Sequence, residues 1–296
     1  MNDSKRAVTV EEQLEILKSR GLIIEDKEKA KEILLDIGYF RLGFYWFPFE
    51  KTYPRKRNRN HEFREEAHFE DAVRLYYFDF DLRNLLLKYI SRVEINFRTT
   101  LIYYTSLRYP DNPFWYVSPE VIKQSFIDNE SFKRSLKNLK EESVISNDIT
   151  NHRRNYAPAW KALEFLSFGN IVSIYENLKD GGLKQTITKV YGWDKSSQFT
   201  NYLNTVRRLR NACAHGKVLY DLKLAEAISD GPLGYLGNYK SSLLGAYKVL
   251  HYLLSRISYN RAKELYEGMR KILQGIKEEK LKQIIRDNSG FDPNNF

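Results

Sequence analysis

The chain has 296 residues, 42% of them hydrophobic, which is enough for one large domain or two modest ones with a sizeable core. The net charge of +10 favours a polyanionic partner such as nucleic acid, although a basic protein without such a partner stays an alternative. A single cysteine, Cys213, excludes an intramolecular disulfide and a CxxC zinc site. We find no signal peptide and no apolar run of membrane-spanning length, so we expect a cytoplasmic protein without membrane contact.

Apolar residues recur at helical spacing along most of the chain, whereas period-2 alternation is scarce. We therefore predict an all-α fold, or nearly so. In chain order we expect a helix opened by the capping box Thr9–Glu12, a second helix from Asp26 to Gly38, a buried aromatic connecting segment over 39–49, a long helix over Phe69–Arg108, an irregular or weakly helical stretch over Ser146–Tyr156, a helix over Ser196–Ala214, long helices over most of Ser241–Arg286, and a frayed tail over Asp287–Phe296.

Two domains are expected. Residues 1–64 would hold the N-terminal helical pair, the aromatic segment and a basic loop, and residues 65–296 would form a larger helical domain with long C-terminal helices. The helical pair is interpreted as a structural cap. A DNA-reading helix-turn-helix is the weaker alternative, because acidic residues such as Asp26 and Glu28 offset its lysines and leave no basic recognition face.

Two basic clusters lie outside the long helices. One is the hydrophilic run 55–61, which we expect to be a mobile loop, and the other precedes the helix that Pro158 opens. Either cluster is suited to gripping phosphates without reading sequence, and the alternative for both is a solvated surface. The candidate RNA-binding residues in them are Arg55, Lys56, Arg57, Arg59, His152, Arg153 and Arg154.

The strongest candidate for chemistry is an Arg-x4-His pair formed by Arg210 and His215. Five residues turn an ideal helix by about 500°, so these two side chains would point roughly 140° apart. A shared site therefore requires the helix to end or bend near His215, and Gly216 permits that as the residue after the helix cap. Asn211 lies four residues before His215, on the same face as Arg207.

These residue types suit RNA cleavage near neutral pH. A histidine moves protons to or from a ribose hydroxyl or a leaving oxygen, and an arginine braces a phosphate. Asparagine orients either group. The alternative is a basic helix end that favours the helix dipole, since this spacing alone is weak evidence.

The stretch Leu209–Gly216 resembles the HEPN signature in its LRNxxAH form, and within that superfamily the chain resembles the Abi-like (abortive infection, AbiD/AbiF type) proteins. Three further segments match this family in order, and together with the signature they cover roughly residues 10–221. They are Ile37–Leu42 with Tyr45 and Pro48–Phe49, then Val93–Thr99, and then Pro158–Asn170.

The resemblance implies an all-helical HEPN bundle with an N-terminal helical extension, and a metal-independent endoribonuclease without cofactor. The ribose 2′-hydroxyl would attack the adjacent phosphate and leave 2′,3′-cyclic phosphate and 5′-hydroxyl ends. His215 would be the general acid or base, Arg210 would stabilise the phosphorane, and Asn211 would complete the catalytic set. The weaker candidates are Arg207, Arg208 and Lys217 for RNA binding, and Glu94 and Arg98 as supporting residues or as an intrahelical ion pair.

HEPN nucleases usually place two motifs across one cleft, so a single motif here implies a homodimer. Members of the family act in phage defence or as toxins of toxin–antitoxin pairs, some with a small RNA partner. Gly216 departs from the second histidine that often follows the motif. The competing interpretation is a non-catalytic RNA-binding HEPN module that partners a small RNA. A metalloenzyme is disfavoured because the sequence has no HExxH motif.

Overall fold

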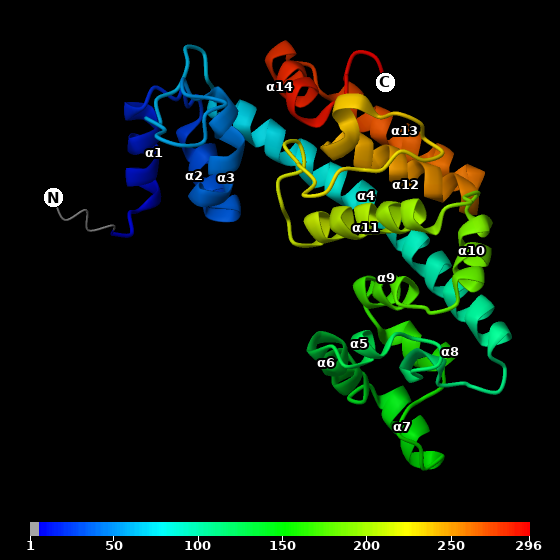
Figure 1. Ribbon diagram of the computed structural model, residues 1–296. Helices are drawn as coiled ribbons and strands as arrows, with labels where there is room; N and C mark the ends of the chain where they lie inside the picture. Colours follow the sequence, from blue (N-terminus) through cyan, green and yellow to red (C-terminus); the bar gives the residue numbers. More distant parts are fainter. Residues whose placement is uncertain (1–5) are drawn as a thin grey trace. The chain divides into compact units, whose positions relative to one another are not determined.

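The computed structural model describes residues 6–296, and Figure 1 shows that helices build this part of the chain. Within it, fourteen α-helices and four short 3-10 helices are joined by loops that carry only isolated β-bridges. The predicted all-α fold is therefore confirmed. Over the same residues, no helix combines the length and the apolar character needed to cross a bilayer.

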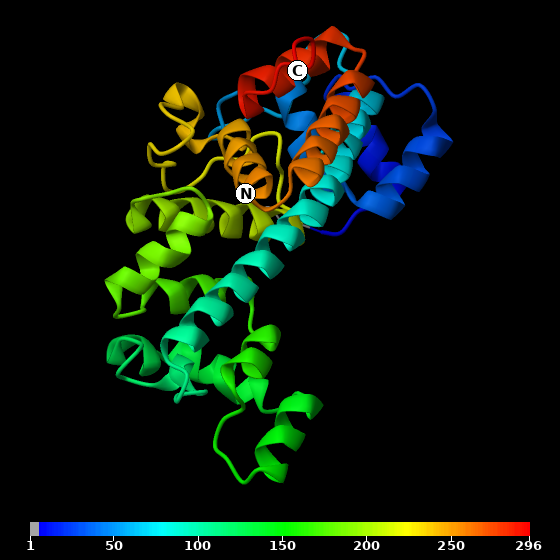
Figure 2. The ribbon, with the colours of Figure 1, turned by 90° about the vertical axis from the view of Figure 1, so that its right-hand side faces the viewer.

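The chain packs as two compact units. Unit 1 comprises the residues up to Arg83 together with Val218–Asp221 and Arg270–Phe296, and unit 2 comprises Asn84–Lys217 and Leu222–Met269. The long helix α4, which Figures 1 and 2 show from two sides, contributes residues to both units. The units do not divide the chain between residues 64 and 65, where the sequence suggests a domain boundary. Whether 1–64 and 65–296 fold separately stays a prediction.

Unit 1 begins with the predicted helical pair. The Thr9 hydroxyl accepts a hydrogen bond from the backbone N–H of Glu12, whose carboxylate accepts one from the Thr9 N–H at 2.8 Å, so the capping box is present. The two helices pack together through buried leucines and an alanine. The helices of this unit are α1 (Val10–Ser19), α2 (Lys27–Ile37), α3 (Tyr39–Trp46), η1 (Phe47–Phe49), the first part of α4 (Phe69–Arg108), and α14 (Glu279–Ser289).

The aromatic segment 39–49 is helical rather than a simple connection, and only one side of it is buried. Gly38, with φ +92°, ends α2 and lets α3 begin at once in a new direction. Tyr45 and Trp46 are buried, whereas Phe40 is 82% exposed. The prediction of a buried connecting segment was therefore wrong for the exposed face. The segment is too short for its helical periodicity to be recognised among so many aromatic residues.

The C-terminal tail, predicted to be frayed, is packed. Gly290 ends α14 in the left-handed conformation, and the next residue, Phe291, is 1% exposed. Arg286 pairs with Asp292 at 2.8 Å, and the Tyr53 hydroxyl donates to Asn288 at 2.7 Å. The hydrogen bond from Tyr53 joins the tail to a segment that is distant in sequence, and a local pattern does not reveal such a contact.

Unit 2 is built around aromatic rings. The Phe97 ring on α4 lies 5.5 to 6.5 Å from the rings of Phe168, Tyr175, Tyr191 and Phe199, which come from three other segments. The helices are α4 from Asn84, η2 (Trp115–Val117), α5 (Gln124–Ile127), α6 (Glu130–Leu139), α7 (Ser143–Asn151), α8 (Ala159–Ala162), η3 (Leu163–Phe165), α9 (Phe168–Glu176), α10 (Gly181–Val190), α11 (Ser196–Ala214), η4 (Gly237–Ser241), α12 (Leu243–Ile257) and α13 (Tyr259–Gly275), the last of which continues into unit 1.

The helices predicted over Phe69–Arg108 and Ser196–Ala214 are confirmed with the same bounds. The stretch 146–156 is half helical, because α7 continues to Asn151 before the chain turns.

Candidate functional site

Helix α11 carries the predicted motif on its last turns. Its buried face consists of apolar and small residues, including Val206, Leu209, Ala212 and Cys213. These residues fix the helix in unit 2, so that the remaining face presents a row of polar side chains. That row comprises Arg207, Arg208, Arg210 and Asn211.

The helix ends as the motif requires. The N–H of Gly216 donates to the carbonyl of Cys213 at 3.1 Å, and the N–H of Lys217 donates to Ala212 at 2.8 Å, which together form a Schellman turn. Gly216 has φ +60°, a conformation that a residue with a Cβ adopts only with strain. His215 is consequently the C-cap residue that follows the last helical residue, Ala214, with φ −90° and ψ 11°. The predicted stop at Gly216 is confirmed.

The structure brings Arg210 and Asn211 together. Arg210 Nη1 donates to Asn211 Oδ1 at 3.4 Å, near the helix end. His215 is exposed, and its ring makes no hydrogen bond or ion pair with any residue in the described range 6–296. Its backbone N–H donates to Asn211 O at 3.0 Å, one helical turn back. Asn211 thus connects the arginine to the turn that carries the histidine.

The neighbouring arginines have different surroundings. The side chain of Arg207 lies beside Gly169 at the start of α9, where a Cβ would be 3.7 Å from the Arg207 Cδ atom. Arg208 pairs with Glu226 at 2.6 Å, and this contact holds the pKa of the Glu226 carboxyl below its usual value. Arg208 therefore has a structural partner, and its predicted role in RNA binding stays a prediction, as does that of Lys217.

Glu94 and Arg98 form the intrahelical ion pair that their spacing predicts, at 3.2 Å. Arg98 is 9% exposed, and its Nη2 also donates to the Leu166 carbonyl at 2.9 Å. It thereby ties α4 to the loop that precedes α9. The structure gives this pair a positioning role in unit 2, and a contact with substrate stays a prediction.

The basic loop belongs to unit 1 and contains both paired and unpaired cations. Arg59 contacts the buried carboxylate of Glu50 and lies 4.3 Å from the centre of the Phe47 ring. Lys56 pairs with Asp221 at 2.9 Å. In contrast, Arg55 and Arg57 are exposed, and neither side chain has a hydrogen-bond or ion-pair partner within residues 6–296. These two arginines keep their full capacity to bind phosphate.

The second basic cluster surrounds a buried acid that sequence reasoning missed. Asp148 is 5% exposed, and Lys161, Arg154 and His152 approach its carboxylate at 2.5, 3.2 and 3.8 Å. Arg153 is in the left-handed region with φ +50° and makes no such contact. Lys161 and Arg154 therefore pair with the Asp148 carboxylate, whereas His152 Nδ1 lies 2.9 Å from the Asp148 backbone carbonyl, and the predicted RNA contact of His152 and Arg154 stays a prediction. The missed signal is the aspartate one helical turn before His152.

The sequence of the chain matches a known protein family. The profile of the Abi-like protein family matches residues 32–221, which is more than half of the chain and includes the whole motif. The chain belongs to the Abi-like protein family. No curated protein and no solved structure matches the chain. The family resemblance inferred from the sequence is thus confirmed, while membership of the HEPN superfamily stays a prediction.

The family match of this Abi-like protein ends beside a buried anchor that the sequence did not reveal. Asp79 on α4 accepts hydrogen bonds from the backbone N–H groups of Leu219, at 2.6 Å, and Tyr220, at 2.8 Å. The Tyr45 hydroxyl donates to the same carboxylate at 3.2 Å, and Arg83 lies 3.8 Å away. Burial raises the pKa of the Asp79 carboxyl to about 6.

All five groups of this anchor belong to unit 1. The anchor fixes the chain directly after the motif, because Leu219 follows His215 by four residues. In the sequence, the signal for this anchor is an aspartate and an arginine that stand four residues apart on the apolar side of a long helix.

Proposed function

We propose that this Abi-like protein is a metal-independent endoribonuclease that acts in phage defence, by abortive infection or as the toxin of a toxin–antitoxin pair. The observation that carries the proposal is the arrangement at the end of α11. Arg210 and Asn211 are in contact, and an exposed histidine without a partner among the described residues stands on the turn that follows them. This combination leaves a positive group and a proton carrier available to substrate.

The reaction needs two proton transfers and charge stabilisation. The ribose O2′ forms a bond to the adjacent phosphorus while the bond from phosphorus to O5′ breaks, which leaves a 2′,3′-cyclic phosphate and a 5′-hydroxyl. One group accepts the proton of the 2′-hydroxyl, and another donates a proton to O5′. His215 is suited to either transfer, and Arg210 is suited to bracing the phosphorane with the help of Asn211.

A single chain offers one such histidine, whereas the reaction uses a base and an acid. We therefore propose a homodimer in which the motifs of two copies share one cleft, as the HEPN resemblance implies. Each copy would supply one histidine. RNA is the proposed partner, and the charge of +10 favours its binding.

The deciding experiment incubates labelled tRNA and mRNA in EDTA with the native protein and with the Arg210→Ala and His215→Ala variants. Arg270→Ala is the matched control, because Arg270 is an exposed arginine on α13 without a partner among the described residues. We expect the native and control proteins to cleave and leave cyclic-phosphate ends, and the two motif variants to be inactive. Equal cleavage by all four proteins would refute the proposal.

The alternative function is an RNA-binding HEPN module that partners a small RNA without cutting it. It is favoured if the native protein leaves RNA intact but binds it tightly, with an affinity that falls steeply with salt. Arg210 and His215 would then contribute to binding alone, and their variants would weaken it.

A further inference from the structure

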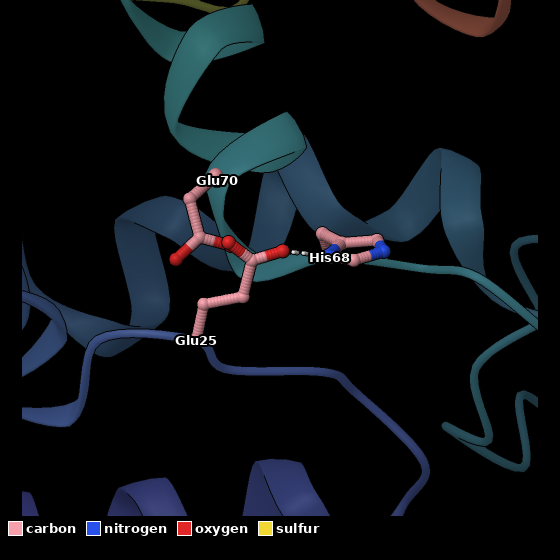
Figure 3. A group of neighbouring side chains, drawn as sticks. All are labelled: Glu25, His68 and Glu70. Carbon is pink, nitrogen blue, oxygen red and sulfur yellow. Dashed lines mark ion pairs between the residues drawn. The ribbon is translucent and has the colours of Figure 1, made fainter.

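Three side chains that can bind a metal converge in unit 1, outside the motif. Glu25 lies between α1 and α2, and His68 and Glu70 lie at the start of α4, as Figure 3 shows. One ligand atom from each residue lies within 4.8 Å of the other two. His68 Nδ1 is 3.0 Å from Glu25 Oε1.

The backbone holds these residues in place. The N–H of Ile23 donates to the Ala67 carbonyl at 2.9 Å, and the N–H of Phe69 donates to the Ile23 carbonyl at 2.9 Å. This bridge aligns the segment after α1 with the segment that enters α4. The fixed main chain therefore brings the three side chains together, in addition to the contact between His68 and Glu25.

Of the three side chains, Glu70 is the one whose charge has no ion-pair partner among the described residues. Its Oε2 atom is buried and has no hydrogen-bond partner. A buried carboxylate oxygen without a partner is costly, and a second carboxylate close by adds repulsion. In Figure 3 the carboxylate of Glu70 points toward that of Glu25. His68 carries at most one positive charge, which is already directed at Glu25.

Nearby cations are occupied elsewhere. Lys280 contacts the carboxylate of Asp71 and donates to the Glu66 carbonyl at 3.1 Å, and Arg74 pairs with Glu278 at 3.2 Å. No lysine or arginine within residues 6–296 forms an ion pair with Glu70. A small cation between the three side chains would satisfy the buried oxygen and offset the repulsion together.

We propose that His68, Glu25 and Glu70 bind one divalent transition-metal cation of the zinc class, with one ligand atom each. An imidazole with two carboxylates suits zinc better than magnesium, which prefers oxygen ligands alone. Tetrahedral ligands at about 2.0 Å from zinc stand roughly 3.3 Å apart. The side chain of Glu25 is 66% exposed, so it can move closer to the other two ligands and reach this spacing.

The site has a structural role, because it would tie the segment between α1 and α2 to the first turn of α4. It is independent of the proposed RNA cleavage. Cleavage in EDTA and zinc binding in unit 1 are separate properties, and the failure of one leaves the other untouched.

The test uses the full chain without a histidine tag, stripped with EDTA and dialysed against Zn²⁺. We expect one zinc per chain by elemental analysis and a melting temperature that rises with zinc. His68→Ala and Glu70→Gln should weaken zinc binding at least tenfold and abolish the rise in melting temperature. Glu65→Gln, which changes an exposed carboxylate next to the site, should bind as the native chain does.

Two measurements guard against misfolded variants. Circular dichroism in EDTA compares the folds, and Glu25→Gln changes an exposed ligand whose loss leaves the buried residues intact. It too should weaken zinc binding at least tenfold. Absence of stoichiometric zinc in the native chain, or equal affinity in the native chain and all three ligand variants, would overturn the proposal. Equal affinity for Mg²⁺ and Zn²⁺ would overturn the assignment to the zinc class.

Discussion

Two clusters that each combine an arginine with polar partners differ in how completely they are paired. Around Asp79, one carboxylate receives two backbone N–H groups and a tyrosine hydroxyl beside Arg83, and the cluster is buried. At the end of α11, the Arg210 side chain is hydrogen-bonded to Asn211 alone, and the His215 ring has no hydrogen bond or ion pair, among the residues that the structure describes. The polar groups of the first cluster are hydrogen-bonded within the fold, whereas those of the second remain available to a ligand.

If the proposed function holds, this difference separates polar groups that hold the fold from polar groups that are available to RNA. It also divides the basic clusters, because Arg59, Arg154 and His152 serve buried acids while Arg55 and Arg57 serve none among the described residues. Substitution should therefore affect stability at one set and RNA chemistry at the other.

The largest effect should come from His215→Ala. For the proposed nuclease we expect RNA cleavage to fall about 10³-fold, which is within the usual range for the loss of an acid–base group. The free energy of unfolding should change by less than about 0.5 kcal/mol, because the side chain is exposed and unpaired among the described residues. Cleavage assays and urea titrations measure the two quantities. A large loss of stability would show that the His215 side chain also supports the fold.

The reverse pattern is expected for Asp79→Ala. Removing this carboxylate leaves two buried backbone N–H groups and the Tyr45 hydroxyl without the acceptor they share, and it takes a nearby negative charge from Arg83, so the free energy of unfolding should fall by about 3–5 kcal/mol. Urea titration followed by circular dichroism measures the loss. Asp81→Ala, an exposed position on the same helix, is the control and should stay within about 0.5 kcal/mol of the native value.

The same carboxyl should make stability depend on pH. Its pKa is raised from 3.8 to about 6 in the folded chain, so its contribution is fully present below pH 3.8 and is lost as pH rises through 6. Between these values the native free energy of unfolding should fall by up to about 3 kcal/mol relative to Asp79→Asn, which does not titrate. Parallel pH profiles of the two proteins would disprove this assignment.

Gly216→Ala should have a moderate effect. A Cβ at φ +60° costs about 1 kcal/mol, and relief of that strain would move the turn that carries His215. We expect a similar loss of unfolding free energy together with slower RNA cleavage. Gly181→Ala is the matched control, because an added Cβ there meets no atom within 4 Å. Unchanged cleavage in Gly216→Ala would show that the turn does not position the histidine.

The smallest effect should separate the cations of the basic loop. If Arg57 contacts phosphate, Arg57→Ala should lower the salt dependence of RNA binding by about one unit of slope and leave stability unchanged. Arg59→Ala should instead lower the free energy of unfolding, because it removes the arginine that pairs with the buried Glu50 carboxylate. Binding titrations at several salt concentrations distinguish the two outcomes.

Features that depend on local sequence were predictable, and features that depend on distant contacts were not. The bounds of α4 and α11 follow from apolar periodicity, and the turn after His215 follows from Gly216. In contrast, the burial of Phe291 and the one-sided exposure of α3 depend on how separate segments pack.

The site divides in the same way. The sequence predicted which motif residues lie at the helix end, because they are close along the chain. It did not reveal that Asp79 holds Leu219, nor that Glu25 meets His68 and Glu70, because no local pattern links residues so far apart.

The anchor at Asp79 also has a consequence for the timing of synthesis. Its hydrogen bonds join residues 140 and 141 positions apart, so they cannot form until the ribosome has made Tyr220. At roughly 5–20 residues per second, about 7 to 28 seconds separate the synthesis of the acceptor from that of its donors. During this interval the growing chain carries α4 without the segment that it fixes. The segment that follows the motif can therefore be anchored only late in translation, when most of the chain has already been synthesised.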